Sequence, residues 1–271
     1  MSSKLIPILA DKAKEVAVLY DTLANYPQGQ LAKIFSDDLT GISNRLDFSQ
    51  ALKRGTFVKV IAELKRRSPS KGALNTNLDA AKVVDSYIKG GAAAISVLTD
   101  QRGFGGSLAD LQAMANKFSM TGVPFLRKDF LIDPIQIAES ILYGADAILL
   151  IAAVLKENLP AMLKKARALK IDALVEVHSI AEAEQAVAAG ATLIGVNNRD
   201  LTSFEVDTQR AFTILKYLSD AVIKIAESGI VEVSLAKEYY AAGYAAVLVG
   251  ETLVKSTNPQ QWIQACSQST E

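Results

Sequence analysis

Residues 143–151, YGADAILLI, place a Gly-Ala pair directly before a run of apolar residues. The arrangement recurs in residues 90–98 (GGAAAISVL) and 189–197 (AGATLIGVN), and residues 242–250 (AGYAAVLVG) repeat it with Gly-Tyr. The glycine suits the left-handed position that ends a helix. A nearly continuous apolar run indicates a strand covered on both faces, as in a parallel sheet. Each copy therefore predicts the end of a helix followed by a buried strand.

Eight apolar runs of this kind occur along the chain. Spacers such as SLADLQAMANKF and KENLPAMLKKARALK repeat apolar residues at three- and four-residue intervals, which is typical of amphipathic helices. The glycine signatures precede every second run, so the repeating unit is two βα modules. This order favours an α/β fold, a closed (β/α)8 TIM barrel, over a doubly wound sheet, because no G-x-G-x-x-G motif follows the first run. We expect the strands at residues 58–63, 93–99, 124–128, 145–151, 173–177, 193–197, 222–226 and 245–250.

The segment before the first strand is too long to be a simple lead-in. Residues 11–26, DKAKEVAVLYDTLANY, space Ala13, Val16, Leu19 and Leu23 along one face, so we expect an extra N-terminal helical segment that packs on the barrel. With no Pro/Ser-rich linker in the chain, residues 1–271 are interpreted as a single domain. Its expected parts are the N-terminal extension 1–57, the barrel core 58–256, and the C-terminal helix and tail 257–271.

Composition excludes several classes of function. The 29 basic and 29 acidic side chains balance, so no charge excess indicates nucleic-acid binding. No apolar stretch reaches the roughly 18 residues of a membrane span, and the N-terminus lacks a signal-peptide core, so we expect a cytoplasmic protein. One cysteine, Cys266, excludes an internal disulfide. One histidine, His178, gives no histidine pair for a metal site.

Polar residues follow seven of the eight expected strands, at the end where barrel active sites lie. Side chains two residues apart in a strand share a face. Any one such pair of polar side chains at a strand end could be a structural ion pair or a helix cap. Their repetition at one barrel mouth indicates a polar substrate, because unpaired buried charges would cost several kcal/mol each. The pairs are Glu63 with Lys65, Glu176 with His178, and Asn197 with Arg199.

The last two strands end in glycine-containing turns, Ser228-Gly229 and Gly250-Glu251. Backbone N–H groups in such turns, together with a following helix N-terminus, can hold an anion. In barrels this position is the usual phosphate site. Tight βα turns without a ligand are the alternative explanation of the same glycines.

Several motifs together resemble the indole-3-glycerol-phosphate synthase family of tryptophan biosynthesis. They include VIAELKRRSPSKG (residues 60–72), PFLRKDF (124–130), IGVNNRDL (194–201), AESGI (226–230) and VLVGE (247–251), in family order along the chain. The resemblance implies a (β/α)8 barrel with an N-terminal extension. It also implies a carbon–carbon lyase that needs no cofactor. The implied substrate is a small phosphorylated molecule, 1-(2-carboxyphenylamino)-1-deoxyribulose 5-phosphate, which is ring-closed with loss of carbon dioxide and water.

The resemblance also implies catalytic roles for five side chains. Lys128 would be the general acid that protonates the substrate ketone during ring closure. Glu176 and Glu63 would serve the dehydration, and the sequence leaves open which of them is the base. Lys65 would be the second acid, an anion ligand, or both. Asn197 would hydrogen-bond the sugar hydroxyls.

Further positions would bind the substrate. Arg199 and Ser68 would meet the anthranilate carboxylate. The aryl ring would pack on Phe104, Phe130 and Leu149. Lys65, Ser228, Gly229, Gly250 and Glu251 would surround the phosphate, although Glu251 stands where some members have serine. The oligomeric state stays open between a monomer and an association with other tryptophan-pathway enzymes.

Three alternatives remain at this point. A sugar-phosphate isomerase would need a cysteine at its acid–base site, and Cys266 lies far from the first strand. An aldolase would use Lys128 as a Schiff-base lysine. A non-catalytic, phosphate-binding subunit would bind without turnover. The segment SPSKG is not a Walker motif, and we expect Ser68 and Lys71 to lie in a mobile loop that closes over the substrate.

Overall fold

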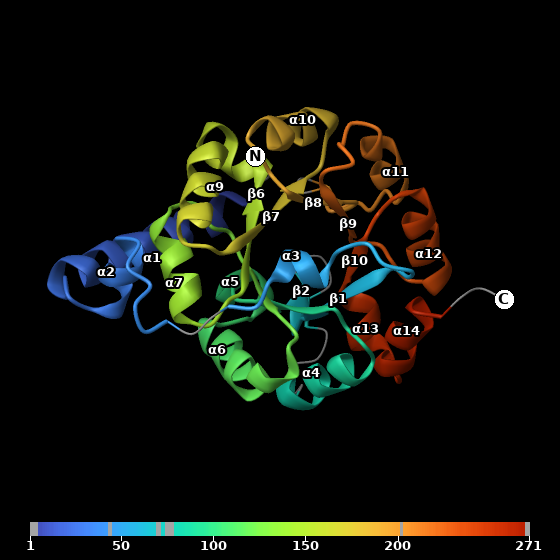
Figure 1. Cartoon of the computed structure of the whole chain (residues 1–271), viewed down its shortest axis with the longest axis horizontal. Coiled ribbons are helices and arrows are strands. Elements are labelled where there is room, and N and C mark those ends of the chain that lie inside the picture. The colour runs from blue at the N-terminus through green and yellow to red at the C-terminus, as the bar shows by residue number, and fades with distance from the viewer. Residues whose placement is uncertain (1–4, 43–44, 69–71, 74–78, 201–202, 269–271) are drawn as a thin grey trace.

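A computed structural model describes residues 5–42, 45–68, 72–73, 79–200 and 203–268. Eight parallel strands in these ranges close into a barrel in the order β1-β10-β9-β8-β7-β6-β5-β4 (Figure 1). The strands are β1 (Lys59–Leu64), β4 (Ala94–Leu98), β5 (Phe125–Lys128), β6 (Ala147–Ile151), β7 (Asp172–Val177), β8 (Leu193–Asn197), β9 (Ile223–Glu227) and β10 (Ala246–Val249). The α/β barrel predicted from the sequence is confirmed.

Helices surround the barrel and connect its strands (Figure 1). They are α4 (Ala80–Lys89), α5 (Gln101–Phe104), α6 (Leu108–Lys117), α7 (Ile135–Leu142), α8 (Ala152–Leu155), α9 (Leu159–Ala168), α10 (Ile180–Ala188), α11 (Gln209–Leu215), α12 (Val233–Ala242), α13 (Glu251–Lys255) and α14 (Pro259–Cys266), with short 3-10 turns η1 (Ser119–Thr121) and η2 (Lys156–Asn158). Of these helices, none is both long and apolar enough to cross a membrane.

The repeated glycines end helices as predicted. Gly91, Gly144, Gly190 and Gly243 follow α4, α7, α10 and α12, and all four have positive φ values. Residues other than glycine rarely adopt this conformation, which turns the chain from the helix into the next strand. The sequence signature therefore corresponds to one recurring αβ connection.

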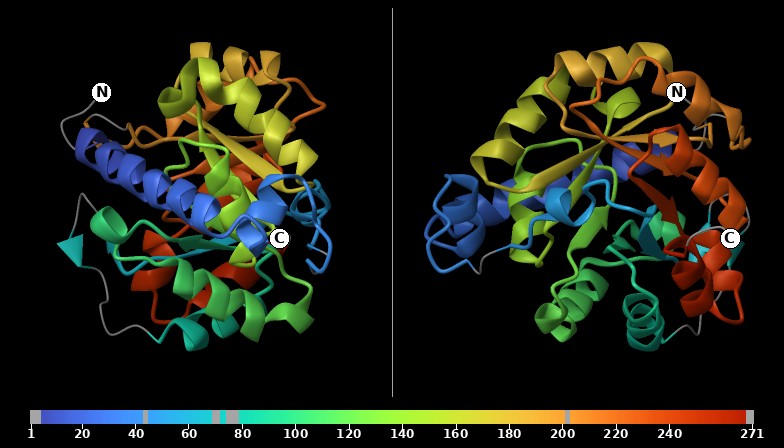
Figure 2. Two further views of the ribbon diagram at one scale, coloured as in Figure 1. Left: turned by 90° about the vertical axis from the view of Figure 1, so that its left-hand side faces the viewer. Right: turned by 45° about the vertical axis from the view of Figure 1, so that its right-hand side comes forward.

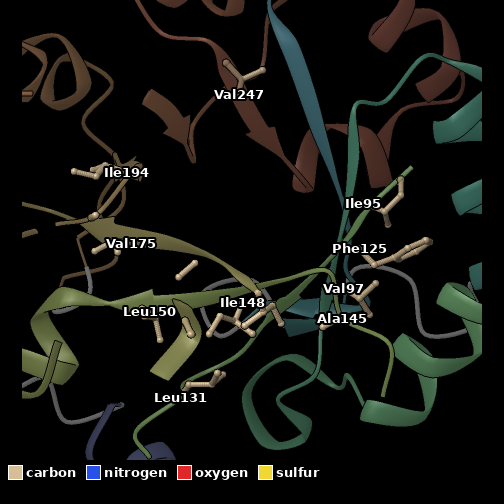
Figure 3. Close-up of a cluster of buried hydrophobic side chains, with 14 of the residues drawn as sticks. Ile95, Val97, Phe125, Leu131, Ala145, Ile148, Leu150, Val175, Ile194 and Val247 are labelled. Atoms are coloured by element: carbon tan, nitrogen blue, oxygen red, sulfur yellow. The ribbon is translucent and has the colours of Figure 1, made fainter. Parts of the chain in front are cut away.

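Alternating side chains divide the apolar residues between two cores. Ile148 and Leu150 of β6 pack outward with Ile95 and Val97 of β4 under the helices (Figure 3). Leu149, between the two β6 residues, belongs to the second core inside the barrel. Because every strand is covered on both faces, its sequence is apolar throughout, as expected for a parallel barrel. Polar residues gather where the inward row reaches the barrel mouth, and Arg127 of β5 is also buried, in the outward row against α7.

The N-terminal extension forms α1 (Leu5–Asn25), α2 (Gln30–Phe35) and α3 (Phe48–Ala51), so the predicted helical segment is confirmed. Figure 2 shows α1 running along the flank of the barrel, where it contacts α7. Val16, Leu19 and Leu23 pack on the outer core as predicted. Ala13 does not, because it is exposed, whereas Lys12 is buried with 2% of its surface exposed. Lys12 precedes Val16 by one helical turn and therefore lies on the same face.

A short antiparallel hairpin follows β1 and was not predicted. It consists of β2 (Arg67–Ser68) and β3 (Gly72–Ala73), and Arg67 pairs with Ala73. Two-residue strands carry no alternation that could be recognised in the sequence. The mobility expected for this loop stays a prediction, because Lys71 and the side chain of Ser68 lie outside the described residues.

Candidate functional site

The polar strand ends meet in one cavity of about 710 Å³ at the C-terminal mouth of the barrel. Side-chain alternation explains their convergence: Leu174 of β7 lies in the barrel core, so Glu176 two residues later also points inward. The volume lies within the range of small-molecule sites, roughly 300–1,000 Å³. Of the residues predicted to form the site, the cavity is lined by Glu63, Lys65, Phe104, Lys128, Phe130, Leu149, Glu176, Asn197, Arg199, Ser228, Gly229, Gly250 and Glu251.

Lys128 occupies the centre of the charged cluster. Its Nζ lies 3.0 Å from Oε2 of Glu176 and 3.0 Å from Oε2 of Glu227. The two carboxylates come from β7, two strands away from β5, which carries the lysine, and from β9, which lies opposite β5 in the barrel. Both carboxylates are almost fully buried. One ammonium therefore bridges two acids in a place where water cannot screen them effectively.

The surroundings change the pKa values of all three groups. Burial acts against the ammonium of Lys128, but the charges of Glu176, Glu227 and Glu63 outweigh burial and raise its pKa. Burial also acts against the ionised Glu176, yet Lys128 and His178 lower the pKa of that carboxyl. Burial dominates at Glu227, whose pKa rises to about 7, with the nearby charge of Glu176 adding to the effect. The cluster thus holds one ionised acid, one acid that titrates near neutrality, and a protonated lysine.

Glu227 lines the cavity but is absent from the site residues predicted from the sequence. The expected seventh strand ended at residue 226, so Glu227 was not considered a residue that points into the barrel. The missed signal is alternation: Ile225 lies in the barrel core, so the residue two positions later must point to the same cavity. Oε1 of Glu227 has no hydrogen-bond partner among the described residues. An unsatisfied buried oxygen at a cavity wall is a candidate contact for a ligand.

Two glycines provide the space that the buried carboxylates occupy. A Cβ atom at Gly195 of β8 would lie 2.0 Å from Oε1 of Glu227. One at Gly250 would lie 2.4 Å from Oε1 of Glu63. Gly250 has a φ of −123°, so its conformation does not demand glycine. Close approach of the Glu63 carboxylate is therefore the reason for glycine at this position.

Glu63 and Lys65 form a second acid–base pair on β1 and the turn after it. Oε1 of Glu63 lies 3.2 Å from Nζ of Lys65. The Lys65 ammonium also lies over the ring of Phe104, 5.4 Å from its centroid. The contact of Lys65 with an aromatic face leaves the lysine beside both the acids and the apolar wall.

The end of β8 presents a guanidinium and an amide to the cavity. Arg199 donates from Nη1 to the backbone oxygen of Phe204 at 3.1 Å, and its Nη2 lies 3.9 Å from Oε2 of Glu251. Oδ1 of Asn197 accepts the backbone N–H of Arg199 at 2.9 Å. Glu251 also pairs with Lys255 at 2.7 Å, so its negative charge is compensated from two sides.

The end of β9 has an unusual backbone. Ser228 has a φ of 65° and Gly229 one of 75°. A Cβ at Gly229 would lie 2.4 Å from Cγ1 of Val206, so only glycine fits. Asn198, fully buried behind the strand, donates to the backbone oxygen of Ser228 at 3.0 Å and holds the turn in place. A non-glycine residue kept at positive φ in a cavity wall is typical of a functional turn.

The apolar side of the cavity uses residues from the N-terminal extension. The rings of Phe104 and Phe130 lie 6.3 Å apart, with Leu149 on the same wall. Leu5 and Ile8 of α1 complete the wall, and neither was predicted. No signal in the sequence connects them to the barrel mouth.

A buried lysine anchors α1 beside the site. Lys12 Nζ lies 2.9 Å from Oδ1 of Asp129 and 3.5 Å from Oδ1 of Asp100. Arg127 pairs with the other oxygen of Asp129 at 3.1 Å. Burial acts against the Asp129 carboxylate, but Arg127 and Lys12 lower its pKa. The ion pair between Lys12 and Asp129 therefore connects the N-terminal extension to the residue that follows Lys128.

Two further observations concern the surroundings of the site. Within the described ranges, no cluster of three or more His, Cys, Asp or Glu residues could hold a metal ion. Arg66, at the start of the hairpin, forms two hydrogen bonds of 2.6 and 2.8 Å with Asp110 of α6. This pair fixes the base of the β2–β3 hairpin close to the cavity.

Comparison with known proteins agrees with this geometry. The sequence model of the family described as Indole-3-glycerol phosphate synthase matches residues 7–266. A protein of that name from Mycobacterium avium is 49% identical over 216 residues, which are 79% of this chain and 78% of that protein. One from Kineococcus radiotolerans is 48% identical over 205 residues, 75% of this chain and 74% of that protein.

The solved structures that resemble the chain are more distant. The 3-hexulose-6-phosphate synthase from Salmonella typhimurium superposes with a TM-score of 0.62 at 16% identity, covering 78% of this chain and 97% of that chain. Thiamine phosphate pyrophosphorylase from Pyrococcus furiosus gives a TM-score of 0.59 at 15% identity, over 78% of this chain and 94% of that one. At such identities the likeness concerns the barrel fold alone.

Proposed function

Because this chain belongs to the indole-3-glycerol phosphate synthase family, we propose that the cavity at the barrel mouth is its active site and assign roles to the side chains there. The enzyme is a carbon–carbon lyase that converts 1-(2-carboxyphenylamino)-1-deoxyribulose 5-phosphate to indole-3-glycerol phosphate, with loss of carbon dioxide and water. The observation that supports the assignment best is the ammonium of Lys128, held between two buried carboxylates.

Lys128 is the general acid of ring closure. Its pKa is raised, so the lysine is fully protonated at neutral pH and can donate to the ketone oxygen as the aryl carbon attacks. A Schiff-base mechanism would instead need a neutral amine, and the two carboxylates oppose deprotonation. The same carboxylates stabilise the ammonium before the substrate arrives. Substrate binding must therefore draw Lys128 away from at least one of them.

Dehydration uses the acids that surround Lys128. One of Glu176 and Glu63 removes the proton that leaves the ring, and an acid, for which Lys65 is one candidate, protonates the departing hydroxyl; Lys65 can also act as an anion ligand. Glu227 joins this set, because a carboxyl with a pKa of about 7 can accept and release a proton near neutrality. Asn197 lies in the same wall and hydrogen-bonds the sugar hydroxyls.

The two charged ends of the substrate take different partners in the cavity. Arg199, with Ser68, receives the anthranilate carboxylate, because a guanidinium matches the two oxygens of a carboxylate. The aryl ring packs on Phe104, Phe130 and Leu149. The phosphate lies at the backbone N–H groups of the turns after β9 and β10. This phosphate site consists of Ser228, Gly229, Gly250 and Glu251, with Lys65 at its edge.

Replacing Lys128 with methionine tests the assignment. Loss of a general acid should lower kcat by roughly 100- to 10,000-fold, with substrate affinity nearly unchanged. Indole formation can be followed by absorbance, and affinity by calorimetric titration. Lys89→Met is the matched control, since Lys89 is exposed on α4 and pairs only with Asp85 among the contacts described. Substrate binding by the unmodified protein without indole formation would reject the function itself. Normal turnover by Lys128→Met would reject the role of the lysine.

We further propose that the enzyme works in the cytoplasm, on a freely diffusing phosphorylated substrate. A monomer suffices for the proposed chemistry, because every side chain assigned a role comes from one chain. Association with other enzymes of tryptophan biosynthesis is the alternative. Sedimentation of the purified protein, alone and in cell extract, separates these two states.

A further inference from the structure

His178 lies outside the cavity wall but in contact with a residue of the active site. It is the first residue after β7, and its side chain is 8% exposed. Nε2 lies 3.2 Å from Oε1 of Glu176, which is within ion-pair distance but does not have the geometry of a hydrogen bond. Nδ1 lies 3.3 Å from Oε2 of Glu182 in the first turn of α10. The imidazole is therefore placed between an inner and an outer carboxylate.

The outer carboxylate is fixed by the start of α10. Oε2 of Glu182 accepts the backbone N–H of His178 at 2.8 Å. The backbone N–H of Glu182 in turn donates to Oγ of Ser179 at 3.2 Å. This is a variant of the capping box, with the glutamate reaching one residue further back. Glu182 is held by the helix cap and cannot leave the ring without breaking it.

The position of the ring between two carboxylates determines its charge. A neutral imidazole carries a lone pair on one nitrogen, and here that lone pair would face a carboxylate oxygen. Only the doubly protonated ring attracts both neighbours. Consistently, the effects of Glu176 and Glu182 outweigh burial and raise the pKa of His178 to about 9.

The two oxygens of Glu176 thus have different cationic partners. Oε2 contacts Lys128, and Oε1 contacts His178. When Lys128 gives its proton to the substrate it becomes neutral, and the negative charges of Glu176 and Glu227 lose their shared cation. His178 is not among the residues that line the cavity and gives up no proton in that step. The positive charge of His178 therefore remains beside Glu176 after Lys128 has become neutral.

We infer that His178 is a positioning residue: clamped by Glu182, the imidazolium holds the Glu176 carboxylate in place and keeps it ionised while Lys128 acts on the substrate. The inference rests on the proposed role of Glu176 in proton transfer. It concerns the charged groups that act on this carboxylate, which are Lys128, His178 and, through repulsion, Glu227.

The pH dependence of kcat tests the inference. In His178→Leu the pKa of Glu176 rises, so the acid limb of the profile should move up by at least one pH unit. At a pH on that limb, kcat should fall at least tenfold. His178→Gln keeps an N–H donor near Glu176 but no charge. It should recover most of the turnover at high pH while its acid limb stays shifted, and it keeps the test valid if the leucine variant fails to fold.

Two controls separate charge from structure. Ser179→Ala weakens the cap of α10, so it should lower stability without moving the acid limb. Glu182→Gln removes the outer charge and should move the limb in the same direction as His178→Gln. Acid limbs that coincide in the unmodified, leucine and glutamine forms, or an equal shift in Ser179→Ala, would overturn the inference. In either case turnover by the unmodified protein leaves the proposed function intact, whereas its absence would reject that function instead.

Discussion

The substitution Gly195→Ala should damage catalysis far more than stability. A Cβ at this position would lie 2.0 Å from Oε1 of Glu227, 3.1 Å from its Cδ and 3.3 Å from Cδ1 of Leu174. Cβ contacts under 3.0 Å are essentially never seen, so the carboxylate must retreat by about 1 Å. Its 3.0 Å contact with Lys128 then lengthens or turns. A misplacement of about 1 Å costs on the order of 100-fold in rate.

Kinetics and unfolding measured on the same variant separate the two effects. We expect kcat to fall by roughly 100-fold. Urea unfolding should show the smaller cost of overpacking, about 1–3 kcal/mol. Gly55→Ala is the matched control, because its Cβ would meet only Cε and Nζ of Lys59, both at 3.7 Å. A Gly195→Ala variant that turns over within twofold of the unmodified enzyme would refute the reasoning, since Glu227 would then tolerate displacement.

Two other substitutions test buried charges. Lys12→Met removes the cation beside Asp100 and one of the two cations that pair with Asp129, so the free energy of unfolding should fall by about 3–5 kcal/mol. The exposed Lys14→Met should change it by less than about 0.5 kcal/mol, and equal effects of the two would contradict the buried network. Glu227 has a folded-state pKa raised to about 7, so its ionisation destabilises the fold as pH rises from its ordinary value through 7. The stability of Glu227→Gln relative to the unmodified protein should therefore increase over that interval by up to about 3 kcal/mol, and a constant difference would exclude the raised pKa.

Much of the fold could be predicted because the residues of each strand indicate its burial without knowledge of the neighbouring strands. An apolar run such as residues 147–151 is buried on both faces wherever it lies in the barrel, and Gly144 marks the turn before it. Short elements lack such a signal. The β2–β3 hairpin has strands of two residues, which depend on the rest of the structure rather than on a sequence pattern.

Site residues could be predicted where they stand at the end of a single apolar strand. They could not be predicted where their role depends on a side chain of a neighbouring strand. Lys128 and Glu176 follow apolar runs directly. The need for glycine at 195 arises from the neighbouring strand, because Gly195 pairs with Ile225 and so lies beside Glu227. Lys12 was not among the residues predicted to pack on the barrel, since the sequence cannot show that Asp129 and Asp100 lie beside it. Complementary charges from distant segments are visible only in three dimensions.

A crystal structure with the substrate, or with an analogue in which the ketone is reduced, tests the central mechanism most directly. We predict Nζ of Lys128 within about 2.6–3.2 Å of the oxygen on the reacting carbon. The phosphate should contact the backbone N–H groups of Gly229 and Gly250, and the aryl carboxylate should contact Arg199. A bound ligand with Lys128 still bridging Glu176 and Glu227, and its ammonium out of reach of that oxygen, would contradict the assignment of Lys128 as the general acid.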